Sequence, residues 1–357
     1  MLLAFFLSWW LWFRPGILQP PPPEKPTNII LVIGDGMGLA HLSLAEILHK
    51  PPSPLQQMEV IGLQKTHSSS HLETDSGASA TAIGCGVKTF NASIGMGPDS
   101  MPVTSIMELA RDHGLKTGFV VTCSVVHATP ASFYAHADSR GSYEEIAAQL
   151  AKSNIDVFVG GGEKYFYNRY VDQENLLKSL EKQNYEVIPT ASMQSKLKLE
   201  RISKEKKIAC FTALEDPLRA TQGREYLPMM VPEVIDALEK RSDKGYFLMI
   251  EASQVDWAAH ANDQQWLSLE MQDTYDMLDA LLDKIDPNSN TLIIITADHE
   301  CGYISIKGKR VPRVVFGSKV HSSQMVPVFA RGPGAEEFAG IYENTEIFEK
   351  MKMLLGL

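Results

Sequence analysis

The sequence predicts an α/β fold in which helices cover both faces of a mostly parallel central sheet. Two observations predict it. Short apolar runs rich in branched residues alternate with stretches of helical spacing, which is typical of strands buried on both faces and joined by crossover helices. Polar side chains able to do chemistry follow several of these runs directly, as expected where ligands bind at the carboxyl ends of parallel strands.

The predicted elements keep this alternation along the chain. The first strand, residues 28–33 (NIILVI), runs into a glycine-rich turn, and a helix is expected over 39–49. Residues 163–227 are the most polar and least patterned stretch, and we expect them at the periphery of the sheet. Further strands are predicted at 116–122, 155–159, 246–250 and 291–296, and further helices from Tyr143, over 228–240, and along the stripe Leu267, Met271, Tyr275, Leu278 and Leu282.

Composition excludes several classes of protein. The chain has 357 residues, of which 44% are hydrophobic and 21% charged, so disordered, collagen-like and coiled-coil interpretations fail. Its 33 basic and 43 acidic residues give a net charge of −10, which argues against a nucleic-acid partner because such a groove needs a basic face. The four cysteines form no C-x-x-C pair, and two disulfides or four free thiols both remain open: Cys85, Cys123, Cys210 and Cys301.

The amino-terminal segment, residues 1–27, differs from the rest. Residues 2–13 are apolar apart from one serine, which is too short a run to span a bilayer and suits an export signal. No basic residue precedes the run, so a membrane-surface anchor or a mis-assigned start also remains open. A proline-rich spacer follows at residues 19–23. We expect one folded domain over residues 28–357.

Acidic and histidine side chains follow three of the predicted strands. Asp35, Glu251 and Asp298 each stand at or just after a strand end, so they should meet at one edge of the sheet. Carboxylates gathered in this way repel one another and lose hydration unless cations lie between them. The same edge should also gather Asp256, His260 and His299.

The spacing of Asp256 and His260 strengthens the metal prediction. The two residues are four apart, so on a helical turn they lie on one face and can share an ion. Carboxylate with imidazole suits Zn²⁺, and oxygen-rich positions suit Mg²⁺. The sequence therefore predicts a site for several divalent ions.

Residues 74–82 (TDSGASATA) supply a candidate nucleophile. Small residues dominate the segment, which permits close approach at a helix amino terminus whose free N–H groups favour an anion. Ser76, beside an aspartate and near the predicted metals, is then a candidate nucleophile. The alternative is structural, because Asp75 or Ser76 can cap the helix.

Taken together, these motifs resemble the alkaline phosphatase family. The resemblance runs from Asn28 to about Phe348, and six motifs occur in the family's order, which makes coincidence negligible. The six motifs are NIILVIGDGMG (28–38), TDSGASATA (74–82), HATPASFYAHADSR (127–140), IEASQVDWAAH (250–260), TADHECG (296–302) and VHSSQMVPVFARGPGAE (320–336).

The resemblance implies two zinc ions and one further ion, usually magnesium. The ligand sets that it implies are Asp256, His260 and His321 for the first zinc; Asp35, Asp298, His299 and, during turnover, Ser76 Oγ for the second; and Asp35, Thr129 and Glu251 for the third ion.

Four more residues are assigned by the resemblance. Arg140 matches the arginine that grips the phosphate and takes part in catalysis, and its planar fork suits two phosphate oxygens. Asp75 is expected to orient Arg140. His127 stands near the third ion where some members carry aspartate, so the choice there between Mg²⁺ and Zn²⁺ stays open. Trp257 is expected to shape the phosphate pocket without coordinating a metal.

The activity that the resemblance implies is phosphomonoester hydrolysis. It proceeds in two in-line steps through a phosphoserine on Ser76 and releases inorganic phosphate from a broad range of small monoesters. A phosphodiesterase or sulfatase of the same superfamily, and a non-catalytic metal- or phosphate-binding protein, are the alternatives. The missing formylglycine context around Ser76 argues against a sulfatase.

Three further expectations concern surroundings and partners. Between His299 and His321 lie 21 residues, which is short for the crown-like insertion that larger members use in dimerisation, so a homodimer rests on the family alone. Cys301 is expected to pack and not to coordinate. The leader and the family's usual location predict a periplasmic or secreted protein, with membrane anchoring through the apolar segment as the alternative.

Overall fold

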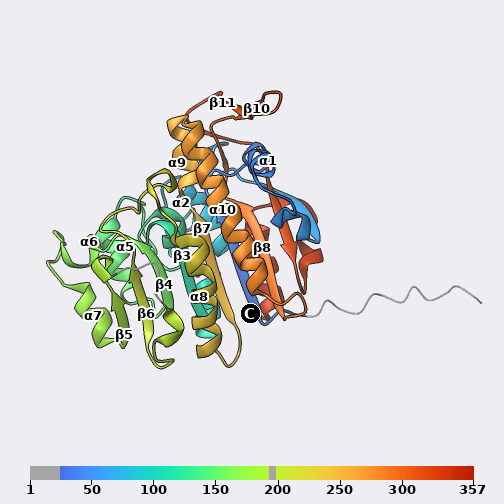
Figure 1. The fold of residues 1–357 in the computed structure, drawn as a ribbon. Coiled ribbons are helices and arrows are strands. Elements are labelled where there is room, and N and C mark those ends of the chain that lie inside the picture. Colours follow the sequence, from blue (N-terminus) through green and yellow to red (C-terminus); the bar gives the residue numbers. More distant parts are fainter. Residues whose placement is uncertain (1–24, 193–197) are drawn as a thin grey trace, which may run out of the picture.

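A ten-stranded sheet forms the centre of the molecule (Figure 1). The computed structural model describes residues 25–192 and 198–357. In this part of the chain the strand order is β14-β2-β13-β8-β1-β7-β3-β4-β6-β5, and β13 alone runs against the others. The strands of the sheet are β1 (Asn28–Gly34), β2 (Val60–Lys65), β3 (Lys116–Ser124), β4 (Val157–Gly161), β5 (Tyr185–Ile188), β6 (Lys207–Phe211), β7 (Tyr246–Ala252), β8 (Thr291–Ala297), β13 (Val326–Arg331) and β14 (Gly340–Glu343).

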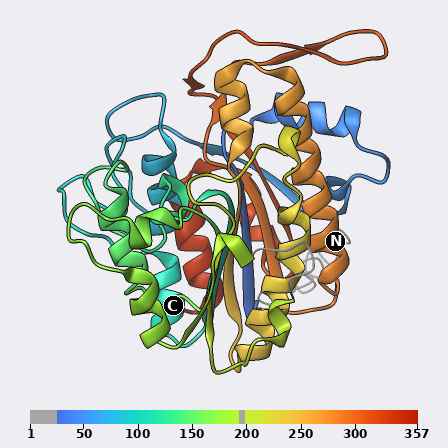
Figure 2. The ribbon, with the colours of Figure 1, turned by 60° about the vertical axis from the view of Figure 1, so that its left-hand side comes forward.

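Helices cover both faces of this sheet, as the sequence predicted (Figures 1 and 2). One face packs against α1, α8, α9 and α10, and the other against α2, α3, α5 and α11. The helices are α1 (Leu39–Leu48), α2 (Ser76–Cys85), α3 (Ile106–Asp112), α4 (Ala128–Ala131), α5 (Tyr143–Leu150), α6 (Lys164–Tyr167), α7 (Leu176–Lys182), α8 (Tyr226–Arg241), α9 (Gln254–Ala261), α10 (Gln264–Lys284) and α11 (Thr345–Leu355). Short 3₁₀ helices lie at Pro54–Gln57, Thr190–Ser192, Leu199–Arg201, Ala220–Gln222 and Ala335–Phe338.

Strand β1, the first apolar run of the described residues, is buried on both of its faces. Ile29 and Leu31 face one helical layer and Ile30 and Val32 the other, and all four are fully buried. Branched side chains pack well on both faces of a pleated strand. Each fully buried side chain of this size contributes about 1.5–3 kcal/mol through removal from water. The carboxyl end of β1 is therefore held firmly at the centre of the sheet.

The long helix α10 confirms the helical stripe read from the sequence. All five of its predicted apolar positions are buried, with Leu282 the most exposed at 6%. The helix begins where the Asp263 side chain accepts a hydrogen bond from Trp266 N, which satisfies one of the free N–H groups of its first turn. Helix α10 packs chiefly against α8 on the same face.

One expectation needs correction. Residues 163–227 lie at the periphery, as expected, but they also supply two strands of the sheet, β5 and β6, at its outer edge. Both strands are short, and the sequence carries polar residues such as Glu186 and Lys207 within them. Periodicity over four or five residues is too short to identify such edge strands.

A two-stranded hairpin lies in the segment between His299 and His321. Strands β10 (Ser305–Lys307) and β11 (Arg313–Val315) pair antiparallel and project beyond α9 at the carboxyl edge of the sheet (Figure 2). A second small ladder, β9 (Glu300–Cys301) with β12 (His321–Ser322), lies at the base of this segment. The segment thus forms ordered structure, and its two ends pair beside the site described below.

The remaining observations concern the amino terminus and the cysteines. The predicted leader and anchor lie within residues 1–24, outside the described residues. Within residues 25–192 and 198–357, none of the helices has the length and apolar character needed to cross a membrane. All four cysteines are buried, and none forms a disulfide within the described part of the chain, so of the two sequence alternatives the structure has the thiols.

Candidate active site and metal centre

The predicted site residues converge at the carboxyl edge of the central strands. Asp35 follows β1, Glu251 lies near the end of β7, and Asp298 follows β8. Because β1 pairs in parallel register with both neighbours, Ile33 stands opposite both Glu251 and Thr296, and the three strands end together. All three carboxylates are fully buried. The convergence expected from the sequence is therefore present.

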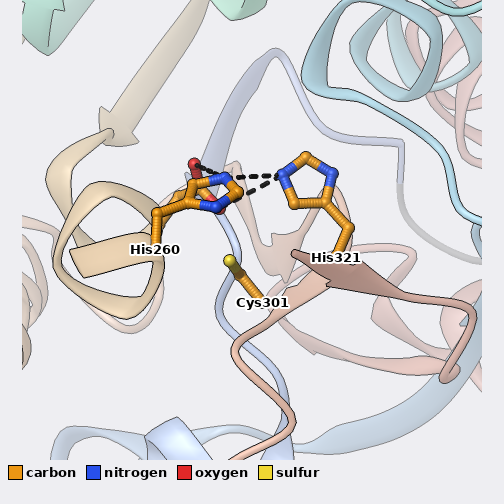
Figure 3. Close-up of side chains that lie close together, drawn as sticks. His260, Cys301 and His321 are labelled. Atoms are coloured by element: carbon orange, nitrogen blue, oxygen red, sulfur yellow. Dashed lines mark hydrogen bonds and ion pairs between the residues drawn. The ribbon is translucent and has the colours of Figure 1, made fainter. Parts of the chain in front are cut away.

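A first group contains Asp256 and His260 on α9 and His321 on β12 (Figure 3). His260 Nδ1 donates to the carbonyl oxygen of Lys319 at 2.5 Å, and His321 Nδ1 donates to that of Thr74 at 2.7 Å. These bonds turn both Nε2 atoms inward, and the two nitrogens lie 3.0 Å apart. Asp256 Oδ2 lies 3.2 Å from His260 Nε2, and Asp256 Oδ1 lies 3.4 Å from His321 Nε2.

Such a group needs a positive charge at its centre. Two imidazole lone pairs 3.0 Å apart repel each other unless a proton or a metal ion lies between them. Although burial lowers the pKa of His321, the Asp256 carboxylate raises that pKa to about 9, so without a metal a proton takes this place. Two nitrogens and a carboxylate are a donor set that fits Zn²⁺.

A second group contains Asp35, Asp298 and His299. Asp298 Oδ1 accepts hydrogen bonds from Gly36 N at 3.0 Å and from His299 N at 2.8 Å. Asp298 Oδ2 lies 3.2 Å and Asp35 Oδ1 lies 3.6 Å from His299 Nε2. Gly36 lies between the two groups, because its N–H donates to Asp298 of the second group and a Cβ on it would lie 2.9 Å from Asp256 Oδ1 of the first. Its φ of +71° also favours glycine. A larger residue at this position would force the first group away from the second.

A third group contains Glu251, His127, Thr129 and Cys123. Donor atoms of Glu251, His127 and Cys123 lie within 4.8 Å of one another, and Cys123 Sγ donates to Glu251 Oε2 at 3.3 Å. Thr129 Oγ1 and Glu251 Oε1 are buried and have no hydrogen-bond partner in the described part of the chain. Burial, together with the charge on Arg140, lowers the pKa of His127 to about 3, so this imidazole is neutral and free to act as a ligand.

The carboxylates of the second and third groups are short of positive charge. Burial raises the pKa of Asp298 to about 6 and that of Glu251 to about 7. Burial, followed by repulsion from Asp298, raises the pKa of Asp35 well above its usual range. Both oxygens of Asp35 lack hydrogen-bond partners among the described residues. Buried anions in this state fit divalent cations, which would neutralise them.

Ser76 lies at the amino terminus of α2, facing the second group. Its Oγ is 3.5 Å from His299 Nε2, and the residue is 2% exposed. Asp75 caps the helix by accepting a hydrogen bond from Ala78 N at 2.9 Å. The capping interpretation is therefore confirmed for Asp75, and it leaves the Ser76 hydroxyl directed toward the metal-ligating side chains.

Arg140 reaches the same place from the loop before α5. Its Nη1 donates to Asp75 Oδ2 at 2.9 Å, and its Nη2 donates to His127 Nε2 at 3.4 Å. Burial works against the charge, but Asp75 raises the pKa of Arg140, so the guanidinium stays charged. Its side chain remains 28% exposed, which leaves donors available to an anion. Trp257 on α9 contacts His127 edge-on, with ring centroids 5.5 Å apart, so its side chain lies beside the third group.

Sequence reasoning did not foresee that two cysteines lie beside the candidate donor groups. Cys123 was not assigned any role, although its position four residues before His127 on the end of β3 is a signal that could have found it. Cys301 was expected to pack. It is fully buried, but its Sγ also lies within 4.8 Å of the donor atoms of the first group (Figure 3).

Comparisons with known proteins agree with this geometry. A family model described as alkaline phosphatase matches residues 26–315. Alkaline phosphatase 4 of Bacillus subtilis is 32% identical and aligns over 90% of this chain and 72% of its own. The alkaline phosphatase of Escherichia coli K12 is 27% identical and aligns over 96% and 89%.

Solved structures give the same result. The alkaline phosphatase from the Antarctic bacterium TAB5 superposes with a TM-score of 0.88 at 39% identity, over 93% of this chain and 99% of its own. A variant of that enzyme, in which a histidine is replaced by glutamate, is described as having Mg bound in the M3 site. The family model covers most of the sequence, and the chain belongs to the alkaline phosphatase family.

Proposed function

We propose that this protein is a metal-dependent phosphomonoester hydrolase that acts through a phosphoserine at Ser76. The observation that carries the proposal is the meeting of a buried serine, an arginine and uncompensated carboxylates in one pocket. Ser76 Oγ lies 3.5 Å from His299 Nε2, and Arg140 donates hydrogen bonds to Asp75, the residue before Ser76, and to His127. The support from relatives is that the similar enzymes named above are alkaline phosphatases.

The donors of the three groups fit two zinc ions and one magnesium ion. Asp256, His260 and His321 would hold the first zinc, and Asp35, Asp298 and His299 the second. When bound, these ions lower the pKa of the attacking hydroxyl and neutralise charge on the phosphoryl oxygens. The third ion would be held by Asp35, Thr129, Glu251 and, in this chain, His127.

The identity of the third ion depends on His127. An imidazole suits Zn²⁺ as well as the oxygen donors suit Mg²⁺. We propose Mg²⁺, because Glu251, Asp35 and Thr129 supply three oxygen donors against one nitrogen. The magnesium described for a TAB5 enzyme variant belongs to a protein whose histidine had been changed to glutamate, so it leaves the choice in this chain to metal analysis.

The chain's own residues divide the reaction between them. Arg140 binds two phosphoryl oxygens through its planar fork, and Asp75 holds that guanidinium in place. Ser76 Oγ forms a bond to phosphorus as the bond to the ester oxygen breaks, and the alcohol leaves with a proton. Water then attacks phosphorus from the opposite side, releases inorganic phosphate and restores the serine. Positioning and charge neutralisation supply most of the rate, as expected for a loose phosphoryl transition state.

Comparison of a monoester with a diester tests the proposal. We expect p-nitrophenyl phosphate to be hydrolysed much faster than bis-p-nitrophenyl phosphate, because a monoester has a third unesterified oxygen for the metal ions in addition to the two that Arg140 would bind, whereas a diester has only two. Prolonged treatment with EDTA should remove the activity, and zinc with magnesium should restore it. Equal rates on both esters would favour a phosphodiesterase. Activity that survives chelation would contradict metal dependence.

A further inference from the structure

Cys301 lies on the same small ladder as a histidine of the first group. In the pairing of β9 with β12, Cys301 is the direct partner of His321. Directly opposed residues in an antiparallel pair project from the same face, with Cβ atoms about 4.5–5.5 Å apart. The thiol and the imidazole therefore enter the same space, although 19 residues separate them along the chain.

The sulfur lies among the donors of the first group. Cys301 Sγ and one donor atom each of Asp256, His260 and His321 all lie within 4.8 Å of one another. Figure 3 shows the sulfur directed toward the two histidines. The backbone fixes this placement, because Cys301 N donates to Gly36 O at 3.1 Å in addition to the pairing with β12.

A second observation indicates a ligand at this place. Asp256 is 5% exposed, and its Oδ1 is buried with no hydrogen-bond partner in the described part of the chain. The same oxygen faces the space between the imidazoles, 3.4 Å from His321 Nε2. A thiolate, two imidazoles and a carboxylate make a four-donor set that suits tetrahedral Zn²⁺.

We propose that Cys301 is a fourth protein ligand of the first metal ion. The inference rests on the proposed function, because it requires a divalent ion at the first group. Catalytic zinc sites commonly keep three protein ligands and one open position. With Cys301 bound, the first metal ion would have four protein ligands. An oxygen of water or substrate would then bind only as a fifth ligand, or after the thiolate had left. The thiolate also shifts the preference of the site toward soft ions.

Cobalt spectroscopy of the full chain tests the proposal. The metal-free protein is titrated with Co²⁺, whose visible bands report binding and whose near-ultraviolet thiolate-to-metal band reports sulfur coordination. We expect the thiolate band in the wild type and its loss in Cys301→Ser, with the visible bands retained. Cys210→Ser, which removes a buried cysteine on β6, is the matched control and should keep the thiolate band.

The outcomes separate this proposal from the proposed function. Visible bands without a thiolate band in the wild type would overturn the role of Cys301 and leave the metal site intact. A thiolate band that survives Cys301→Ser but is lost in Cys123→Ser would assign the sulfur ligand to the third group, and would also overturn it. Failure to bind cobalt at all would overturn both proposals.

A second measurement avoids dependence on the variants. Zinc-edge X-ray absorption of the wild-type holoenzyme should contain a sulfur shell at about 2.3 Å beside the nitrogen and oxygen shell. Absence of that shell would overturn the proposal even if Cys301→Ser failed to fold.

Discussion

Two sets of buried carboxylates in this molecule differ in how their charge is balanced. In one set, which we call the Arg224 cluster (Arg224, Glu270 and Asp273), Nη2 of the arginine lies 2.5 Å from Glu270 Oε2 and 2.6 Å from Asp273 Oδ2. Trp266 Nε1 and Ala220 N also donate to Glu270, at 2.8 and 2.9 Å. This cluster carries its own cation, so it needs nothing from outside the chain.

The other set, the site carboxylates (Asp35, Glu251 and Asp298), has no such cation. In the described part of the chain no lysine or arginine forms an ion pair with any of the three. Their raised pKa values record the cost of that arrangement. In the Arg224 cluster, where buried carboxylates hold elements together, the fold supplies a guanidinium to balance their charge. At the site carboxylates, where we propose that metal ions bind, it supplies none.

The largest expected effect is the loss of turnover when Ser76, beside the site carboxylates, is replaced. Ser76→Ala removes the proposed nucleophile and should lower kcat on p-nitrophenyl phosphate by at least about 10³-fold. Because Ser76 is not needed to gather the carboxylates, zinc content and the free energy of unfolding should stay unchanged. Metal analysis and urea unfolding of the purified variant check both points. Zinc lost together with activity would instead make Ser76 a structural residue.

The next largest effect concerns the Arg224 cluster. Arg224→Ala leaves two buried carboxylates without a partner and should lower the free energy of unfolding by about 3–5 kcal/mol. The loss should be the same with and without metals, and activity per folded molecule should persist. Urea unfolding measures the loss in the metal-loaded and EDTA-treated proteins.

Arg219 provides a matched control for that experiment. It lies in the same segment and stacks on Trp266, with its guanidinium carbon 3.7 Å from the ring centre. Arg219→Ala should cost only about 0.5–1 kcal/mol. A loss from Arg224→Ala no larger than that of the control would show that the cluster does not stabilise the fold.

A smaller effect concerns Arg140, whose guanidinium lies near the site carboxylates. Arg140→Ala removes charge-assisted hydrogen bonding to phosphate, and a net loss equal to one such bond, about 1.5–3 kcal/mol, should raise the inhibition constant of inorganic phosphate by roughly 10- to 100-fold. Turnover should fall less, because Ser76 and the metal ligands remain. Competitive inhibition assays give both numbers, and an unchanged inhibition constant would contradict the role of Arg140.

The contrast also marks what sequence could predict. The strand that ends at Asp35 and the helix turn joining Asp256 to His260 are local patterns, so the sheet centre and most of the site followed from spacing and motif. The Arg224 cluster did not, because Arg224 and Glu270 are 46 residues apart and belong to different elements. The proximity of Cys301 to the first group was not foreseen for a similar reason. The meeting of Cys301 with His321 depends on the register of a two-residue ladder, which carries no periodic signal.

The smallest expected effect is the contribution that the site carboxylates make to the pH dependence of stability. Their folded pKa values lie above the ordinary values near 4, reaching about 6 for Asp298 and about 7 for Glu251. At these carboxylates the folded metal-free protein therefore holds more protons than the unfolded chain between those limits, and their contribution to stability falls as pH rises from about 4 to about 7. Bound metals remove this loss, so this contribution should widen the gap in Tm between loaded and EDTA-treated protein as pH rises.

The Arg224 cluster serves as the internal reference for that measurement. Burial raises the pKa of Asp273 to about 6, but this group has no contact with a metal and contributes equally to both curves. The difference in Tm between loaded and metal-free protein removes this shared contribution but still contains the site histidines, such as His127, whose lowered pKa makes stability rise with pH. Asp298→Asn removes one titrating group and should flatten the decline of the metal-free protein. Equal pH slopes for metal-free Asp298→Asn and metal-free wild type would mean that Asp298 does not titrate in this interval, and the contrast between the two clusters would then fail.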